Sequence, residues 1–198
     1  MHKTKSKKKE RQVIIIDLDD TLIDTSSFKK VIFDRISSQA DIAKREIEKI
    51  YQEIKRKENK NPLSTLCLKI GRKSKKNKDI FEKTILSAIK TIKINKKVLN
   101  FVKKYEGYKI LLTLGETKFQ KAKIEFLKEK TKIDKIVNEI MITREDKLRF
   151  ISSKIKRDNF RFRGKSYKSL VILDDKIDLF SDLKKYSFIK LIHPKEIE

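Results

Sequence analysis

A short apolar run close to the start of the chain constrains the fold most. Residues 12–18 are dominated by Val and Ile and lack the alternation of polar and apolar positions that marks a half-exposed strand. Such a run predicts a strand buried on both faces, as in a parallel sheet with helices on both sides. Two carboxylates, Asp17 and Asp19, stand where this strand ends. We therefore expect a ligand site at the carboxyl edge of the sheet, where such sheets bind their ligands.

The rest of the chain predicts a three-layer α/β core of the Rossmann-like kind. Four more apolar runs indicate strands, at residues 108–113, 137–142, 170–173 and 187–192. Between them lie segments with apolar residues at helical spacing, at 98–105, 119–127 and 148–155. Strands that alternate with helices are typical of βα units on a parallel sheet.

Residues 26–95 give no convincing strand signal and have helical spacing in several places, as at Ile47, Tyr51 and Ile54. We interpret them as a small all-helical insertion in a core formed by residues 12–25 and 96–198. Residues 1–11 are basic, have no apolar periodicity and are expected to be a disordered tail.

Polar residues stand at or just after the other predicted strands. Thr113 ends one strand, Lys147 would open the helix after another, and Asp174 and Asp175 follow a third. Clustered carboxylates repel one another, and Mg²⁺ is the cation that takes oxygen ligands while leaving positions open for phosphate oxygens. A hydroxyl and an ammonium suit the phosphoryl oxygens themselves.

These residues resemble the ordered motifs of the haloacid dehalogenase (HAD)-like hydrolases. The sequence DLDDT at 17–21 resembles the DxDx(T/V) motif, and LTLG at 112–115 resembles the second motif. Lys147 is similar to the third motif, although Leu rather than Pro follows it. The acidic pair at 174–175, with Asp178 downstream, resembles the fourth. All four motifs occur in the order of the family.

The resemblance implies a Mg²⁺-dependent phosphatase with a helical cap over a small phosphorylated substrate. Asp17 would be the nucleophile that forms an aspartyl-phosphate, and Asp19 the general acid and base. An Asp rather than Thr at position 19 favours phosphatases and phosphomutases over ATPases, and argues against a dehalogenase. The other implied roles are metal binding by Asp17, Asp19, Asp174 and Asp175, and phosphate binding by Thr113, Gly115 and Lys147.

Three points stay open in this interpretation. Lys123 competes with Lys147 as the phosphate-binding lysine. Either Asp174 or Asp175 could reach the metal. Asp178 could support the metal site or could simply be an acidic residue in the first turn of a helix, and the two roles are equally well supported. A catalytically silent binding module on the same core, and with less support a response-regulator receiver, are the alternatives to an enzyme.

The net charge of +24 raises nucleic acid as a partner. Two further alternatives on the same core are therefore a phosphatase that processes nucleic-acid ends and a basic nucleic-acid-binding protein. A general bias toward Lys and Ile explains the charge more simply, so we favour a small phosphorylated substrate. The best feature for nucleic acid is residues 157–168, where aromatic residues alternate with cations and could stack on bases. We interpret this segment as a helix end and a basic loop. A single cysteine, Cys67, and the lack of a long apolar stretch favour a soluble, cytoplasmic protein.

Overall fold

A computed structural model describes residues 12–57 and 61–198. The described chain forms two compact units. The first, the core unit, contains residues 12–23, 94–114 and 127–198, and the second, the helical unit, contains residues 24–93 and 115–126. The expected tail at residues 1–11 lies outside the described residues. No helix in the described ranges is long and apolar enough to cross a membrane.

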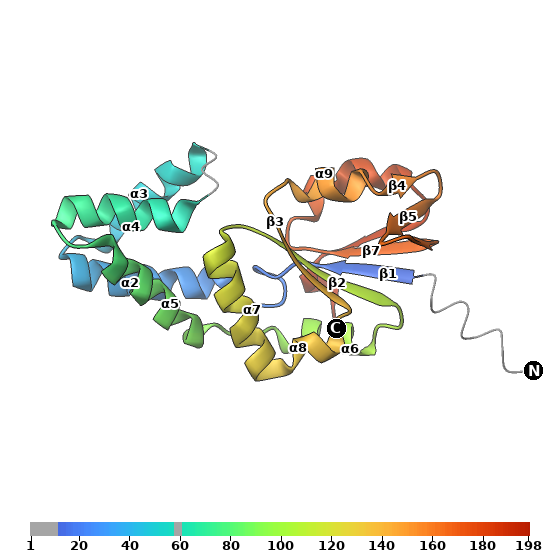
Figure 1. Cartoon of the computed structure of the whole chain (residues 1–198), viewed down its shortest axis with the longest axis horizontal. Coiled ribbons are helices and arrows are strands. Elements are labelled where there is room, and N and C mark those ends of the chain that lie inside the picture. The colour runs from blue at the N-terminus through green and yellow to red at the C-terminus, as the bar shows by residue number, and fades with distance from the viewer. Residues whose placement is uncertain (1–11, 58–60) are drawn as a thin grey trace, which may run out of the picture. The chain divides into compact units, whose positions relative to one another are not determined.

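The core unit contains a five-stranded sheet in the order β3-β2-β1-β7-β8 (Figure 1). Every pair of neighbouring strands is parallel, with Ile15 of the central strand aligned with Ile110 on one side and Ile172 on the other. This confirms the predicted α/β core. The strands are β1 (Gln12–Ile16), β2 (Tyr108–Leu114), β3 (Glu139–Thr143), β7 (Ser169–Leu173) and β8 (Ile189–Ile192).

The sheet is buried on both faces because its strands are apolar at successive positions. Ile14 and Ile16 of β1 are fully buried on one face. Figure 1 shows helices α6 (Lys96–Lys104) and α8 (Ile133–Ile136) on the side of the sheet opposite α9 (Lys147–Ser152). On the other face, side chains of β1, β2 and β7 pack against α9 and the 3-10 helix η2 (Ile177–Lys185) and form one apolar cluster with them. The strand residues of this cluster are Val13, Ile15, Ile110, Leu112, Leu170 and Ile172. A short 3-10 turn, η3 (Pro194–Glu196), ends the fold.

A second, antiparallel sheet corrects the interpretation of residues 157–168 as a helix end and a basic loop. It consists of β4 (Ile155–Lys156), β5 (Asn159–Phe162) and β6 (Lys165–Tyr167). Its aromatic residues Phe160, Phe162 and Tyr167 are buried in the apolar cluster of the core. Successive side chains of a strand point to opposite faces, so aromatic and polar residues alternate in a strand that has one covered face. These rings are not exposed for stacking on bases.

The helical unit contains only helices among its described residues. They are α2 (Thr25–Ala40), α3 (Lys44–Arg56), α4 (Pro62–Ser74), α5 (Lys78–Ala88), the 3-10 turn η1 (Ile89–Thr91) and the first turns of α7 (Thr117–Thr131). Each helix buries one apolar stripe, as Phe28 and Ile32 do in α2 and Phe81 does in α5. Cys67 is buried among them, as its apolar neighbours predicted.

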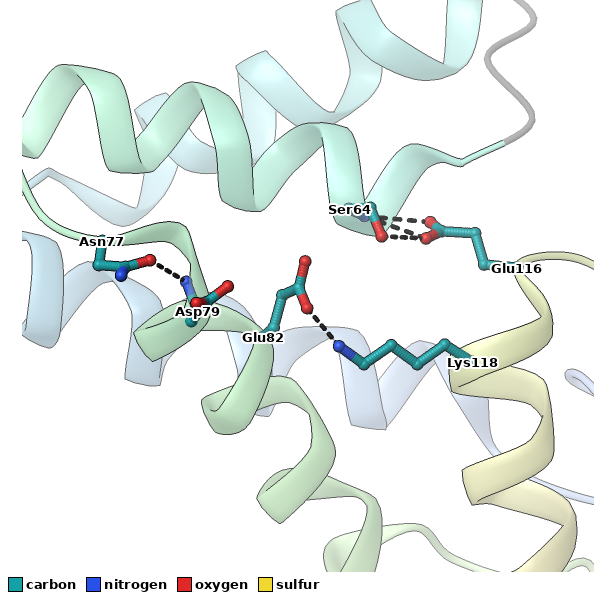
Figure 2. Close-up of polar contacts among 6 residues, drawn as sticks. All are labelled: Ser64, Asn77, Asp79, Glu82, Glu116 and Lys118. Carbon is teal, nitrogen blue, oxygen red and sulfur yellow. Dashed lines mark hydrogen bonds and ion pairs between the residues drawn. The ribbon is translucent and has the colours of Figure 1, made fainter.

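The division of the chain differs from the expected one in two respects. The insertion has the bounds 24–93 instead of 26–95, and residues 115–126 group with the helical unit. Polar contacts explain this grouping (Figure 2). The carboxylate of Glu116 accepts hydrogen bonds from the backbone N–H groups of Leu63 (2.6 Å) and Ser64 (3.1 Å). These groups lie in the first turn of α4, where backbone N–H groups have no acceptor within the helix. Lys118 of α7 also forms an ion pair with Glu82 of α5. The carboxylate thus caps a helix whose own N-cap residue, Asn61, makes no capping hydrogen bond with its side chain.

Candidate active site

Three carboxylates meet at the carboxyl edge of the parallel sheet. Asp17 follows β1, and Asp174 and Asp175 follow the neighbouring strand β7. One oxygen from each lies within 4.8 Å of the others. The backbone N–H of Asp17 donates to the carbonyl of Leu173 at 2.9 Å, which continues the ladder beyond the last pair of the two strands. The parallel register therefore fixes the distance between the acidic residues of the two strands.

Lys147 lies between two of these carboxylates. Its Nζ is 2.7 Å from Oδ1 of Asp17 and 2.6 Å from Oδ2 of Asp174. Lys147 is the first residue of α9, and the carboxylate of Asp146 caps that helix by accepting from the backbone N–H of Arg149 at 3.1 Å. The cap fixes where the helix begins and so directs the lysine toward the acidic residues.

The competing lysine belongs to the other unit. Lys123 is part of the helical unit, where its Nζ lies 5.8 Å from the centre of the Phe28 ring. Its side chain is buried there. Within the core unit, Lys147 forms the ion pairs with Asp17 and Asp174.

Burial dominates the electrostatics of the cluster. It raises the pKa of Asp17 to about 7, because the ion pair with Lys147 only partly offsets the loss of solvent and the repulsion from Asp174 and Asp19. Burial also raises the pKa of Asp175. For Lys147, burial lowers the pKa, but the attraction of Asp17 and Asp174 is larger and the net shift is upward. The lysine therefore stays charged, while Asp17 titrates near neutrality.

Thr113 is the second-last residue of β2, the strand that neighbours β1 on the side away from β7, and its hydroxyl has an unmet capacity for hydrogen bonding. The side chain is fully buried, and Oγ1 has no hydrogen-bond partner among the described residues. A buried hydroxyl without a partner costs about 1–3 kcal/mol, so Thr113 Oγ1 is a candidate hydrogen-bond donor to a bound ligand. Gly115, two residues further on, falls in the helical unit, with a φ of 150° that disfavours a side chain.

Thr21 is a positioning residue that the sequence analysis did not single out. Its Oγ1 accepts a hydrogen bond from the backbone N–H of Asp175 at 3.1 Å and so ties the loop after β1 to the loop after β7. The signal was present, since Thr21 is the last residue of the DLDDT motif. Asp19 is half-buried in the same loop, close enough to raise the pKa of Asp17. Asp178 is exposed and lies outside the acidic cluster.

Comparison with solved structures identifies the fold. A HAD-like hydrolase from Burkholderia xenovorans superimposes with a TM-score of 0.69 at 15% identity, over 93% of this chain and 82% of that one. A protein from Thermotoga maritima assigned as a β-phosphoglucomutase gives 0.60 at 15%, over 94% and 96%. A HAD-type hydrolase from Bacillus subtilis, bound to magnesium, gives 0.53 at 11%, over 83% and 77%. No family model and no curated protein sequence matches the chain.

The sheet order and the helices define a Rossmann-like α/β protein, with three carboxylates and Lys147 close together at the carboxyl edge of its sheet. The chain has the fold of the haloacid dehalogenase-like hydrolases. The resemblance that the four sequence motifs indicated is thereby confirmed at the level of the fold.

Proposed function

We propose that this protein is a Mg²⁺-dependent phosphatase that hydrolyses a phosphate monoester through a phosphorylated Asp17. The observation that carries the proposal is Lys147, held between Asp17 and Asp174 beside a third carboxylate. An ammonium that is fixed next to a nucleophile suits a substrate with negative charge on the reacting group. The unpartnered hydroxyl of Thr113 supplies a hydrogen-bond donor for the same group.

The acidic cluster fits a hard divalent cation. Three carboxylates are set against the ammonium groups of Lys147 and, at Asp175, Lys176, so the cluster keeps an excess of negative charge that burial makes costly. The raised pKa of Asp17 expresses this cost. All three side chains offer oxygen, which Mg²⁺ prefers. Asp17 and Asp175 would hold the ion with the backbone carbonyl of Asp19, and the bound ion would neutralise charge on the phosphoryl oxygens.

The residues of the chain account for both halves of the reaction. An oxygen of Asp17 bonds to phosphorus while the bond from phosphorus to the ester oxygen breaks, and Asp19 gives that oxygen its proton. Asp19 then removes a proton from water, which attacks phosphorus, releases phosphate and restores Asp17. Lys147 and the hydroxyl of Thr113 bind the phosphoryl oxygens throughout.

Hydrolysis of para-nitrophenyl phosphate with and without Mg²⁺ tests the proposal. We expect release of para-nitrophenol that requires the ion and stops when it is chelated. A protein that hydrolyses neither this ester nor any member of a panel of phosphorylated metabolites, with Mg²⁺ present, would contradict it.

The binding of Mg²⁺ is expected to weaken as the pH falls below about 7. The pKa of Asp17 is raised to about 7 by burial, so a proton competes with the cation for this carboxylate below that value. Once Asp17 is largely protonated, the dissociation constant should rise roughly tenfold per pH unit. Calorimetric titrations with Mg²⁺ at several pH values measure this. An affinity that is the same one unit above and one unit below this pKa would show that Asp17 does not bind the ion.

Asp175→Asn is expected to weaken Mg²⁺ binding more than Asp174→Asn does. Both oxygens of Asp174 already accept, Oδ2 from Lys147 at 2.6 Å and Oδ1 from the backbone N–H of Lys176 at 2.9 Å. Asp174 therefore acts through Lys147, and a supporting residue of this kind affects metal affinity by about 10–100-fold. The loss for Asp175→Asn should exceed this range. The same titrations compare the two variants, and the reverse order would assign the direct ligand to Asp174.

A further inference from the structure

The sheet β4–β6 concentrates positive charge in a way that the bias of the chain toward Lys does not explain. Residues 154–168 hold seven Lys or Arg and one Asp. Half of the Arg of the chain, five of ten, lie within residues 144–163. A bias toward Lys and Ile would not gather Arg in one place. We call this segment the basic sheet, with cations Lys154, Lys156, Arg157, Arg161, Arg163, Lys165 and Lys168.

The outer face of this sheet carries cations and none of its three aromatic residues. Phe160, Phe162 and Tyr167 point into the core, so the alternate residues, such as Arg161, point outward. Lys156 is exposed on the same outer face, whereas Lys165 is paired with Phe162 and lies over the ring of Tyr108. Arg161 is exposed on the outer face, opposite Ser166 in the register. The sheet thus presents a polar, basic face to solvent.

Both hairpin turns of the basic sheet place an Arg where the backbone favours another residue. Arg157 and Arg163 each open a two-residue turn and have positive φ values, of 51° and 46°. Asn, Asp and Gly are the residues favoured at such positions. Each turn therefore carries a guanidinium at its tip although the backbone conformation there is unfavourable for Arg. Such strain points to a functional role for the two charges.

Few acidic residues neutralise this face. Arg163 forms an ion pair with Glu139 at 3.0 Å, and Asp158 lies in the first turn. Arg157 and Arg161 form no ion pair within the described part of the chain. The acidic cluster is too far away to compensate them, because the basic sheet packs on Tyr108 at the amino end of β2 whereas the cluster lies at the carboxyl edge.

We propose that the outer face of the basic sheet binds the phosphate backbone of nucleic acid without regard to sequence. Arg is suited to phosphate because its guanidinium offers two parallel N–H donors. The buried rings leave no aromatic residue on the basic sheet to stack on bases, so contact is restricted to the backbone. An anionic membrane fits less well, since the exposed large apolar residues of ranges 12–57 and 61–198 are Leu68, Ile80, Leu114 and Leu179, none of which belongs to this sheet.

The test uses the full chain and a fluorescently labelled DNA duplex of mixed sequence. Anisotropy titrations from ~50 to ~200 mM NaCl should show affinity that falls steeply with salt. The double variant Arg157→Asn/Arg161→Gln should lower the affinity about tenfold or more and reduce the slope of log affinity against log salt by about 2. Asn is favoured at the φ of residue 157, so the variant should melt no lower than the wild type.

The matched control is Lys97→Gln/Lys104→Gln, which removes the same charge from exposed positions on α6 of the same unit. Its affinity and salt slope should stay close to those of the wild type. If both double variants weaken binding equally, binding depends on the net charge alone, and the proposal is overturned. Absence of duplex binding, or binding of anionic phospholipid vesicles in its place, would overturn it too. If the first variant melts low, Arg161→Gln alone, at an exposed position, decides between these outcomes.

Discussion

Replacement of Asp17 by Asn is expected to abolish Mg²⁺-dependent hydrolysis, with a fall in kcat of at least ~10³-fold. The amide cannot attack phosphorus, and it removes a ligand from the acidic cluster. The rate of para-nitrophenol release by the purified variant measures the effect. A rate equal to that of the wild type would remove Asp17 from the mechanism.

The same substitution should not destabilise the metal-free protein above pH 7. The pKa of Asp17 is raised on folding, so its contribution to stability is full at low pH and is lost as the pH rises through about 7. Asn avoids that loss, and Lys147 keeps its contact with Asp174. Melting temperatures of the two metal-free proteins at mildly alkaline pH should therefore be equal, or higher for the variant. A clear drop would mean that lost activity reflects lost folding.

Replacement of Lys147 by Met should damage both stability and activity. It leaves Asp17 and Asp174 buried without their shared cation, and breaking a buried pair in this way costs roughly 3–5 kcal/mol. The loss should shrink as the pH falls, because protonation removes the uncompensated charge. The value of kcat/KM should fall ~10²–10³-fold, as when one stabilising group is removed from an active site. Urea unfolding at two pH values and steady-state kinetics measure the two effects.

Lys123→Met is the matched control for this experiment. It removes a buried lysine of the helical unit that pairs with the ring of Phe28. We expect it to change the stability of that unit but to leave the affinity for Mg²⁺ and for inorganic phosphate near the wild-type value. A larger effect on phosphate affinity from Lys123 than from Lys147 would contradict the assignment of Lys147 to the acidic centre.

The fold could be predicted from the sequence largely because its strands carry an unambiguous pattern. The run Val13–Ile16 is apolar at successive positions, which only a doubly covered strand tolerates. The predicted strands lie within one or two residues of the observed ones, as at β2 and β7. The basic sheet was missed because its strands have only two to four residues, too few for alternation to be distinguished from a loop.

The candidate site could be predicted in part. Residues at strand ends are brought together by the parallel register, so Asp17, Thr113 and Asp174 followed from the strand assignments. The choice between Lys147 and Lys123 depends on which unit each helix joins, and local spacing carries no information on that. The motif marked Thr21, but its role did not follow from the sequence, because its bond to the backbone of Asp175 joins loops 154 positions apart in the chain.

Trapping of the phosphorylated enzyme tests the central claim most directly, and Asp19→Asn is the variant to use. Para-nitrophenolate leaves readily without a proton from Asp19, whereas hydrolysis of the phosphorylated enzyme needs a base to activate water. We predict a rapid release of one equivalent of para-nitrophenol per chain, then slow turnover, with the phosphoryl group found on Asp17 by peptide mass spectrometry. No burst, or a phosphoryl group on another residue, would contradict catalysis through Asp17.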